Sequence, residues 1–283
     1  MKRCSFLLLA LFLSLVSLPM ARAQTSFVLS TNYAVSPSPS SVVMADLNGD
    51  GKPDLACASY PDNAINILLN VGGGIFSSNT SYAAPGICFL GSADFNGDGK
   101  ADLVYATLNN TLVVLTNNGA GQFASNATYS VSGTVYDFAT ADLNGDGKAD
   151  LVACCYNGYV ATVLTNRGDG FLVAEGSFNV NSQYPRWVTV ADFNHDGKMD
   201  FAVADYYFPR TLVVFTNDAN MSFAQSSALD ISSAGWAFGV TSADVNGDGL
   251  PDLIGSGGGG GNTLAVSTNA GGGSFARYVT YGT

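Results

Sequence analysis

DLNGDGKPD, at residues 46–54, is the first of five copies of one acidic stretch. The other four are DFNGDGKAD at 94–102, DLNGDGKAD at 142–150, DFNHDGKMD at 192–200 and DVNGDGLPD at 244–252. Successive copies begin 48, 48, 50 and 52 residues apart. A repeat of about fifty residues is typical of a four-stranded propeller blade. The period therefore predicts one repeat fold across the chain rather than two unrelated domains.

Strand-like segments flank every copy of the acidic stretch. A short apolar segment ends in alanine directly before it, and two more apolar segments follow, as at 103–106 and 111–115. A Gly-rich turn that closes on phenylalanine, as at 117–123, then indicates a hairpin into a fourth strand. The fold class predicted is all-β, a β-propeller with five blades, or five blades of a six- or seven-bladed ring. Segments 27–34 and 275–283 both resemble a fourth strand, and either would serve to close the ring.

The spacing inside the acidic stretch is that of a hard-cation loop. Oxygen side chains stand at positions 1, 3, 5 and 9, glycine at position 6 permits a sharp turn, and position 7 offers its carbonyl. Imidazole appears only as His195, at the non-ligand position 4, so softer metals are disfavoured. An EF-hand also requires Glu at position 12 and flanking helices, which this sequence lacks.

The loops therefore predict up to five calcium ions with a mainly structural role. Three carboxylates crowd each loop, and binding to the folded state alone would stabilise it. The predicted ligands are Asp46, Asn48, Asp50, Lys52, Asp54; Asp94, Asn96, Asp98, Lys100, Asp102; Asp142, Asn144, Asp146, Lys148, Asp150; Asp192, Asn194, Asp196, Lys198, Asp200; and Asp244, Asn246, Asp248, Leu250, Asp252.

Apolar residues at positions 2 and 10 of each loop, such as Leu47 and Leu55, are expected to anchor the loop in the blade core. The residue at position 7, lysine in four copies and leucine in the fifth, is expected to bind through its carbonyl with its side chain in solvent.

With these loops, the chain resembles the FG-GAP or VCBS repeat family, the calcium-binding blades also found in integrin α heads. The resemblance covers residues 27–283 and rests on five loops in register. It implies a calcium-binding propeller that acts in extracellular recognition or adhesion. The "FG" element itself matches at Phe238-Gly239 and departs from the pattern in the other copies.

Charge and composition exclude several classes of partner. The formal net charge is −11, and clustered Lys and Arg, which nucleic acid and anionic membranes require, are absent. Hydrophobic residues make up 47% of the chain, which is enough for a sizeable core and excludes a disordered protein.

The amino terminus has the pattern of a signal peptide. Basic Lys2 and Arg3 precede an apolar run, and the sequence Ala-Arg-Ala at 21–23 fits a cleavage site. The prediction is a signal peptide at 1–23 and a propeller at 24–283, secreted to the extracellular space, or to the periplasm in a bacterium. No second apolar segment is long enough to span a membrane, and a monomer is expected. Cysteines 57, 88, 154 and 155 are interpreted mainly as small buried hydrophobes, with a 57–88 disulfide as a minor alternative.

The sequence favours a binding module over an enzyme. Nucleophile elbows, zinc-protease motifs and phosphate loops are absent, so no catalytic residue is assigned. The segments expected opposite the calcium loops are rich in aromatic residues and arginine, which suit a protein or glycan ligand. The candidate ligand-binding residues are Tyr156, Arg186, Trp187, Tyr206, Tyr207 and Trp236. A lectin is the main alternative, and a propeller polysaccharide lyase or hydrolase is a weaker one.

Overall fold

The computed structural model describes residues 32–180, 184–206, 210–218, 221–232, 236–258 and 263–282. Residues 33–283 form one compact unit. Strands make up the main secondary structure of the described part of that unit, which also contains loops and short 3-10 turns such as η1(Tyr156–Gly158). The predicted all-β class is confirmed. The predicted signal peptide lies outside the described residues.

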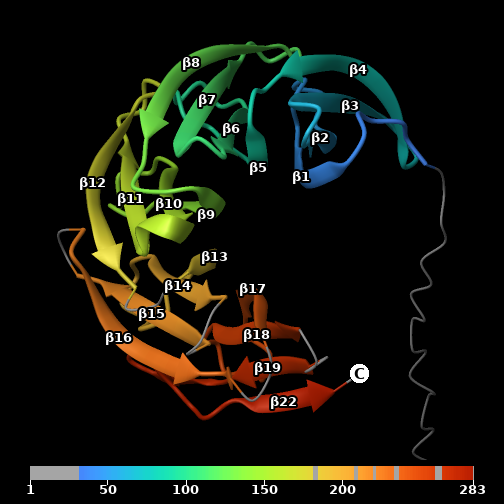
Figure 1. The fold of residues 1–283 in the computed structure, drawn as a ribbon. Coiled ribbons are helices and arrows are strands. Elements are labelled where there is room, and N and C mark those ends of the chain that lie inside the picture. Colours follow the sequence, from blue (N-terminus) through green and yellow to red (C-terminus); the bar gives the residue numbers. More distant parts are fainter. Residues whose placement is uncertain are drawn as a thin grey trace, which may run out of the picture. The chain divides into compact units, whose positions relative to one another are not determined.

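Five antiparallel sheets of four strands each follow the five repeats (Figure 1). Blade 1 contains β1(Pro39–Ala45), β2(Asp54–Ser59), β3(Ala64–Gly72) and β4(Ile75–Ala83). Blade 2 contains β5(Ile87–Ala93), β6(Asp102–Thr107), β7(Thr111–Asn117) and β8(Phe123–Ser130). Blade 3 contains β9(Val135–Ala141), β10(Asp150–Cys155), β11(Val160–Asn166) and β12(Leu172–Asn179).

Blade 4 contains β13(Pro185–Ala191), β14(Asp200–Asp205), β15(Thr211–Asn217) and β16(Phe223–Asp230). Blade 5 contains β17(Trp236–Ala243), β18(Asp252–Gly258), β19(Thr263–Ser267) and β22(Val279–Gly282), with a small hairpin of β20(Asn269–Gly271) and β21(Ser274–Phe275) before its last strand. The chain is therefore a five-bladed β-propeller, as its period predicted.

Successive blades are joined through their first strands. Contacts run from β1 to β5, from β5 to β9, from β9 to β13 and from β13 to β17. Alternation along each strand sends one set of apolar residues to the preceding blade and the other set to the following blade. The hydrophobic core is consequently divided into layers between neighbouring blades.

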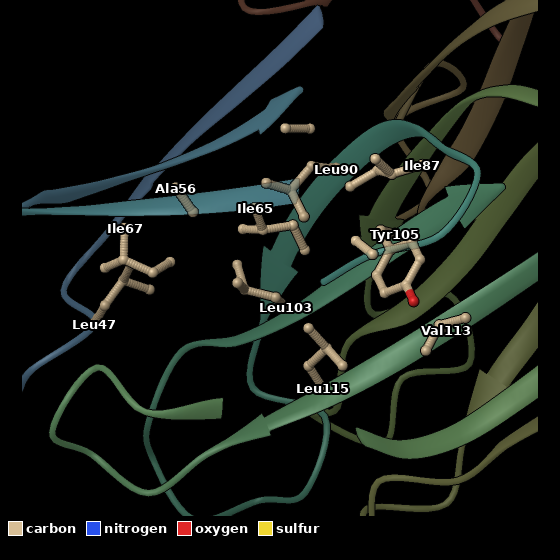
Figure 2. Packing of buried hydrophobic residues seen from close by; sticks show 12 residues of the cluster. Leu47, Ala56, Ile65, Ile67, Ile87, Leu90, Leu103, Tyr105, Val113 and Leu115 are labelled. Atoms are coloured by element: carbon tan, nitrogen blue, oxygen red, sulfur yellow. The ribbon is translucent and has the colours of Figure 1, made fainter. Parts of the chain in front are cut away.

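The layer between blades 1 and 2 shows this packing (Figure 2). Ala56 and Ile65 of blade 1 meet Leu90 and Leu103 of blade 2, and all four side chains are buried. Full burial of a leucine or isoleucine side chain contributes about 1.5 to 3 kcal/mol. Cysteines 57, 154 and 155 are buried as predicted, Cys88 is partly buried, and all four are free thiols.

Tyrosine clasps join the outer edges of neighbouring blades. The Tyr82 hydroxyl, from outer strand β4, donates to the Gly121 carbonyl at 3.3 Å and accepts the Phe123 N–H at 3.1 Å. Tyr129 of β8 makes the same pair of bonds to Gly170 and Leu172 of blade 3. The outer strand of one blade therefore fixes the turn of the next.

The last blade takes its outer strand from its own repeat. β22 pairs with β19 in antiparallel register, with Leu264 opposite Tyr281. Of the segment 275–283, residues 279–282 complete blade 5 and do not pair with blade 1 as considered from the sequence. Most of the alternative closing segment, 27–34, lies outside the described residues.

Candidate functional site

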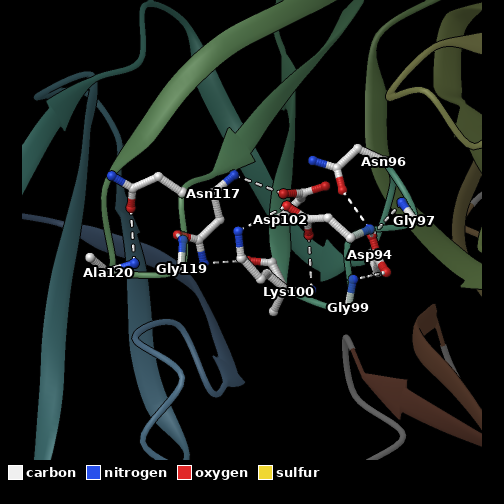
Figure 3. Close-up of polar contacts among 12 residues, drawn as sticks. Asp94, Asn96, Gly97, Gly99, Lys100, Asp102, Asn117, Gly119 and Ala120 are labelled. Atoms are coloured by element: carbon white, nitrogen blue, oxygen red, sulfur yellow. Dashed lines mark hydrogen bonds and ion pairs between the residues drawn. The ribbon is translucent and has the colours of Figure 1, made fainter.

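Each acidic loop connects the first and second strands of its blade and is organised by its own side chains. In loop 94–102, the two carboxylate oxygens of Asp94 accept the N–H groups of Gly97 at 2.7 Å and Gly99 at 2.8 Å (Figure 3). The Asn96 side-chain oxygen accepts the Asp98 N–H at 3.0 Å. Oxygens at positions 1 and 3 thus hold the tight turn together.

Position 4 of the loop requires a left-handed backbone, which explains its residue choice. Gly97 at this position has φ +75°, and His195 in the fourth loop has φ +62°. Glycine adopts this conformation without steric strain, whereas a residue with a Cβ does so rarely. The His195 side chain is exposed, in agreement with its place at a non-ligand position.

The aspartate at position 9 is fully buried in all five loops and links two segments of backbone. In blade 2, Asp102 accepts the Phe95 N–H at 3.0 Å with one oxygen and the Asn117 N–H at 2.7 Å with the other. The corresponding pairs occur in the other blades. Burial raises the pKa of Asp102 and Asp150, and raises that of Asp200 to about 6. This residue therefore joins the loop to the end of the third strand.

The lysine at position 7 keeps its side chain exposed to solvent, as predicted, and there it pairs with the aspartate at position 5. Lys52 Nζ lies 2.8 Å from Asp50, and the same pair occurs at 3.2, 3.2 and 3.0 Å in the next three loops. The hydrogen bond from the Lys52 ammonium lowers the pKa of Asp50. Four loops thus carry an internal positive charge beside a predicted calcium ligand.

The fifth loop differs because position 7 is Leu250. Asp248 accepts a hydrogen bond from the Asn246 side-chain amide at 2.8 Å instead of an ammonium. Its position-2 residue, Val245, is 50% exposed, whereas the position-2 residues of the other four loops are at most 2% exposed. The predicted anchoring at position 2 is confirmed in four loops and wrong in the fifth. At position 10, Leu55 is half-buried and its four counterparts are buried.

The donor chemistry of the loops fits a hard divalent cation. Carboxylate and amide oxygens alternate along each loop, and an oxygen that accepts one N–H keeps a second lone pair for a metal. Within the described ranges, however, no three His, Cys, Asp or Glu side chains gather into a metal-holding group. In this arrangement the position-5 carboxylate faces lysine in four loops, and the position-9 carboxylate faces backbone N–H groups in all five.

A cluster of aromatic rings and one arginine lies at the opposite ends of the first strands in blades 3 and 4. We call it the aromatic surface, and it comprises Tyr136, Tyr156, Tyr159, Tyr184, Arg186, Trp187 and Tyr206. The Tyr156 ring lies 4.8 Å from Tyr136 and 4.7 Å from Tyr184, measured between centroids. Such spacing is favourable for aromatic pairs. Because β9 and β13 begin here and end at the acidic loops, the two candidate sites are separated by the length of a strand.

Arg186 is stacked at the centre of this surface. Its guanidinium carbon lies 4.7 Å from the Tyr136 ring centre, 4.7 Å from that of Tyr206 and 5.0 Å from that of Trp187. The ion pairs found among the described residues do not include Arg186. A guanidinium held by aromatic faces is positioned to meet a carboxylate while its stem stays packed.

The structure brings together four of the six predicted ligand residues: Tyr156, Arg186, Trp187 and Tyr206. Tyr207 lies outside the described residues, and only the backbone of Trp236 is described, in β17. Tyr136, Tyr159 and Tyr184 complete the cluster. After β10 the chain turns through η1, and Tyr159 directly after it has a left-handed backbone conformation. Sequence spacing alone could not show that these rings meet across two blades.

Asp137 lies beside the aromatic surface but points into the joint between blades 3 and 4. Its carboxylate accepts the Val188 N–H at 3.0 Å, and the residue is only 9% exposed. Burial raises the pKa of Asp137 to about 7. This carboxyl group therefore joins two first strands rather than facing a ligand.

Comparison with protein families agrees with the five loops and blades. A model of the FG-GAP-like repeat matches residues 94–153, 142–203 and 192–255, and a model of the FG-GAP repeat matches residues 38–73. The chain belongs to the FG-GAP repeat family. The resemblance inferred from the acidic loops is confirmed. No curated protein matches this FG-GAP chain.

Solved structures share the fold at low sequence identity. A crystal structure of BBS1N in complex with ARL6DN, soaked with lead, has a TM-score of 0.60 at 11% identity, over 87% of this chain and 68% of that one. A mercury-soaked crystal of the same complex has a TM-score of 0.53 at 14% identity, over 86% of this chain and 80% of that one. A crystal structure of a protein from Lactobacillus plantarum has a TM-score of 0.62 at 17% identity, over 85% of this chain and 70% of that one. No helix in the described part of this FG-GAP chain is long and apolar enough to cross a membrane.

Proposed function

We propose that this FG-GAP propeller is a secreted, calcium-binding recognition module that binds an extracellular protein ligand through its aromatic surface. The observation that carries the proposal is Arg186, stacked on three rings and outside the ion pairs of the described residues. A propeller fold of this family suits recognition or adhesion, and the proposal includes no catalytic step. The preferred ligand presents an acidic side chain beside apolar groups.

A protein ligand is favoured over a glycan by the distribution of the rings. A lectin with one sugar pocket between each pair of blades would repeat its aromatic residues around the propeller. In the described residues the rings of the aromatic surface belong to blades 3 and 4 and follow one another as one continuous surface. Ring pairs elsewhere, such as Tyr82 with Phe123, lie at the joints between blades. Aromatic residues and arginine are also the side chains enriched at protein interfaces.

Calcium in this proposal stabilises the acidic loops and thereby the propeller that carries the aromatic surface. The residues that would hold the ion are those at positions 1, 3 and 5, the carbonyl at 7 and the buried aspartate at 9. Calcium supplies two positive charges to a loop with three carboxylates, whereas the lysine at position 7 supplies one. The protein's own contribution is the turn built by positions 1, 3 and 4.

A random peptide phage library, panned on the protein in millimolar calcium, tests the ligand class. We expect enrichment of peptides with Asp or Glu, and at least tenfold weaker binding of those peptides to Arg186→Ala. Arg167→Ala is the matched control, because Arg167 pairs with Asp169 at the acidic-loop end of blade 3. Peptides that bind both variants equally would refute the assignment of the surface. A selective glycan-array signal lost in Arg186→Ala would move the assignment to a lectin.

A further inference from the structure

The face that each blade turns to the next blade is buried in blades 1 to 4. Two positions show this most clearly: position 2 of the acidic loop and the second residue of the third strand. At the second of these positions, Ile65, Leu112, Ala161 and Leu212 are all 0% exposed. In blade 5 the corresponding Leu264 is 44% exposed, and Val245 at loop position 2 is 50% exposed. Blade 5 therefore carries an uncovered apolar face of the kind that a following blade covers.

Blade 1 carries the complementary face, which is uncovered along its first strand, β1. Leu90, Phe138 and Val188, from the first strands of blades 2 to 4, are at most 6% exposed because the preceding blade covers them. The corresponding residue of β1, Val42, is 61% exposed, and Met44 on the same side of β1 is 66% exposed. Exposed apolar patches on soluble proteins commonly mark interaction sites.

Tyr33 is a second sign that blade 1 is built to receive a neighbouring blade. Its hydroxyl donates to the Gly74 carbonyl at 3.3 Å and accepts the Phe76 N–H at 3.0 Å. These are the bonds that outer-strand Tyr82 and Tyr129 make to blades 2 and 3. The ring of Tyr33 also meets Phe76 edge-on at 5.5 Å, as Tyr82 meets Phe123 at 5.6 Å.

We propose that blade 5 of one copy of this protein packs on blade 1 of a second copy, with Val245 and Leu264 placed against Val42 and Met44. The occupant follows from the repeat itself. At each of the four joints within the chain, the face that one blade turns to the next packs on the face that the next blade turns back. Blade 5 has an uncovered face of the first kind, and blade 1 has an uncovered face of the second kind. The contact is head-to-tail, so each copy keeps one free face and association continues beyond a dimer unless a ring closes.

Association has to compete with Tyr33, which already makes the tyrosine bonds to Gly74 and Phe76 of blade 1. A docking blade brings its own outer strand β22, in which Tyr281 is 57% exposed and occupies the register position of the clasp tyrosines. Tyr33 and Tyr281 of the second copy would then be alternatives for the same Gly74 and Phe76 groups. Tyr33→Phe, which removes the hydroxyl of the resident tyrosine, is expected to move association to a lower protein concentration.

Light scattering after size-exclusion chromatography, over a hundredfold range of protein concentration, tests the proposal. We expect the average mass of the wild type to rise with concentration. Val42→Asp blocks one face and Leu264→Asp the other, so each variant alone is expected to remain monomeric. An equimolar mixture keeps one intact face on each variant and is expected to form a dimer. Val173→Asp is the control, because Val173 is exposed on outer strand β12 away from both faces.

Three results would overturn the proposal. The first is a wild type that remains monomeric at every concentration, which would mean that the faces are closed within one copy or covered by another partner. The second is association that Val173→Asp weakens as much as Val42→Asp does. The third is a mixture of the two single-face variants that forms no dimer although circular dichroism shows both to be folded.

Discussion

Asp137 gives the sharpest prediction about stability. The carboxyl group lies in the joint between blades 3 and 4, and burial raises its pKa from 3.8 to about 7. The folded protein therefore holds a proton on Asp137 over a pH range in which the unfolded chain has released it. Stability from this group is fully present below about pH 4 and is lost as the pH rises through 7.

The magnitude follows from the size of this shift. Each pKa unit corresponds to about 1.4 kcal/mol, so a difference of about three units costs roughly 4 kcal/mol by pH 8. Asp137→Asn keeps an oxygen for the Val188 N–H and carries no charge. We expect the variant to be more stable than the wild type at pH 8 and to lose that advantage progressively down to pH 4.

Urea denaturation at half-unit steps from pH 4 to pH 8.5 measures the difference directly. Loop carboxylates also titrate, but they are common to both proteins and cancel in the comparison. Asp62→Asn, at an exposed position, is the control and should leave the pH dependence unchanged. A free-energy difference between wild type and Asp137→Asn that is flat across this range would refute the reasoning.

Three further predictions concern the loops and clasps. Asp102→Ala leaves two buried N–H groups without an acceptor, so urea denaturation should show a loss of about 2 to 6 kcal/mol. Tyr129→Phe removes the clasp on blade 3 and should cost about 1 kcal/mol; an unchanged midpoint would show that the clasp adds nothing. Lys148→Leu removes the ammonium near Asp146, so calorimetry should show calcium affinity raised up to about fivefold in that loop; weaker binding would contradict the competition between lysine and calcium.

Much of the fold could be predicted from sequence because the chain repeats itself. Five loops in register fix the period, and glycine at position 6 predicts the tight turn that the structure shows. The buried residues at position 2, such as Leu47 and Phe95, followed from their fixed place next to the first aspartate. The period and the turn depend on neighbours within one repeat, which a single sequence displays, whereas burial at position 2 also requires the following blade.

Features that depend on contacts between repeats could not be predicted in the same way. Val245 occupies the same loop position as Phe193 but is exposed, because its burial depends on the next blade and not on its own loop. Asp137 and Arg186 are close in the fold through β9 and β13, although 49 positions separate them in the chain. The Tyr82 and Tyr129 clasps do have a sequence pattern, because a phenylalanine stands six residues before each tyrosine in its outer strand. Only the structure shows that these tyrosines bond to the next blade.

The lysine at position 7 shows where a motif is ambiguous. Calcium-loop chemistry uses only the carbonyl at this position, so the motif says nothing about the direction of the side chain. In the structure Lys52 folds back on Asp50, since the two groups lie two residues apart in a tight turn. The loop is thus partly neutralised by its own lysine.

A thermal melt in saturating calcium, compared with one in excess chelator, tests the central claim most directly. At a free calcium concentration of about 100 times the dissociation constant, one site contributes roughly 2.7 kcal/mol, which corresponds to roughly 5 to 10 °C for a chain of this size. We predict a melting temperature at least that much higher with calcium, reversed by the chelator and not reproduced by magnesium at the same concentration. Identical melts with calcium and with chelator would contradict it.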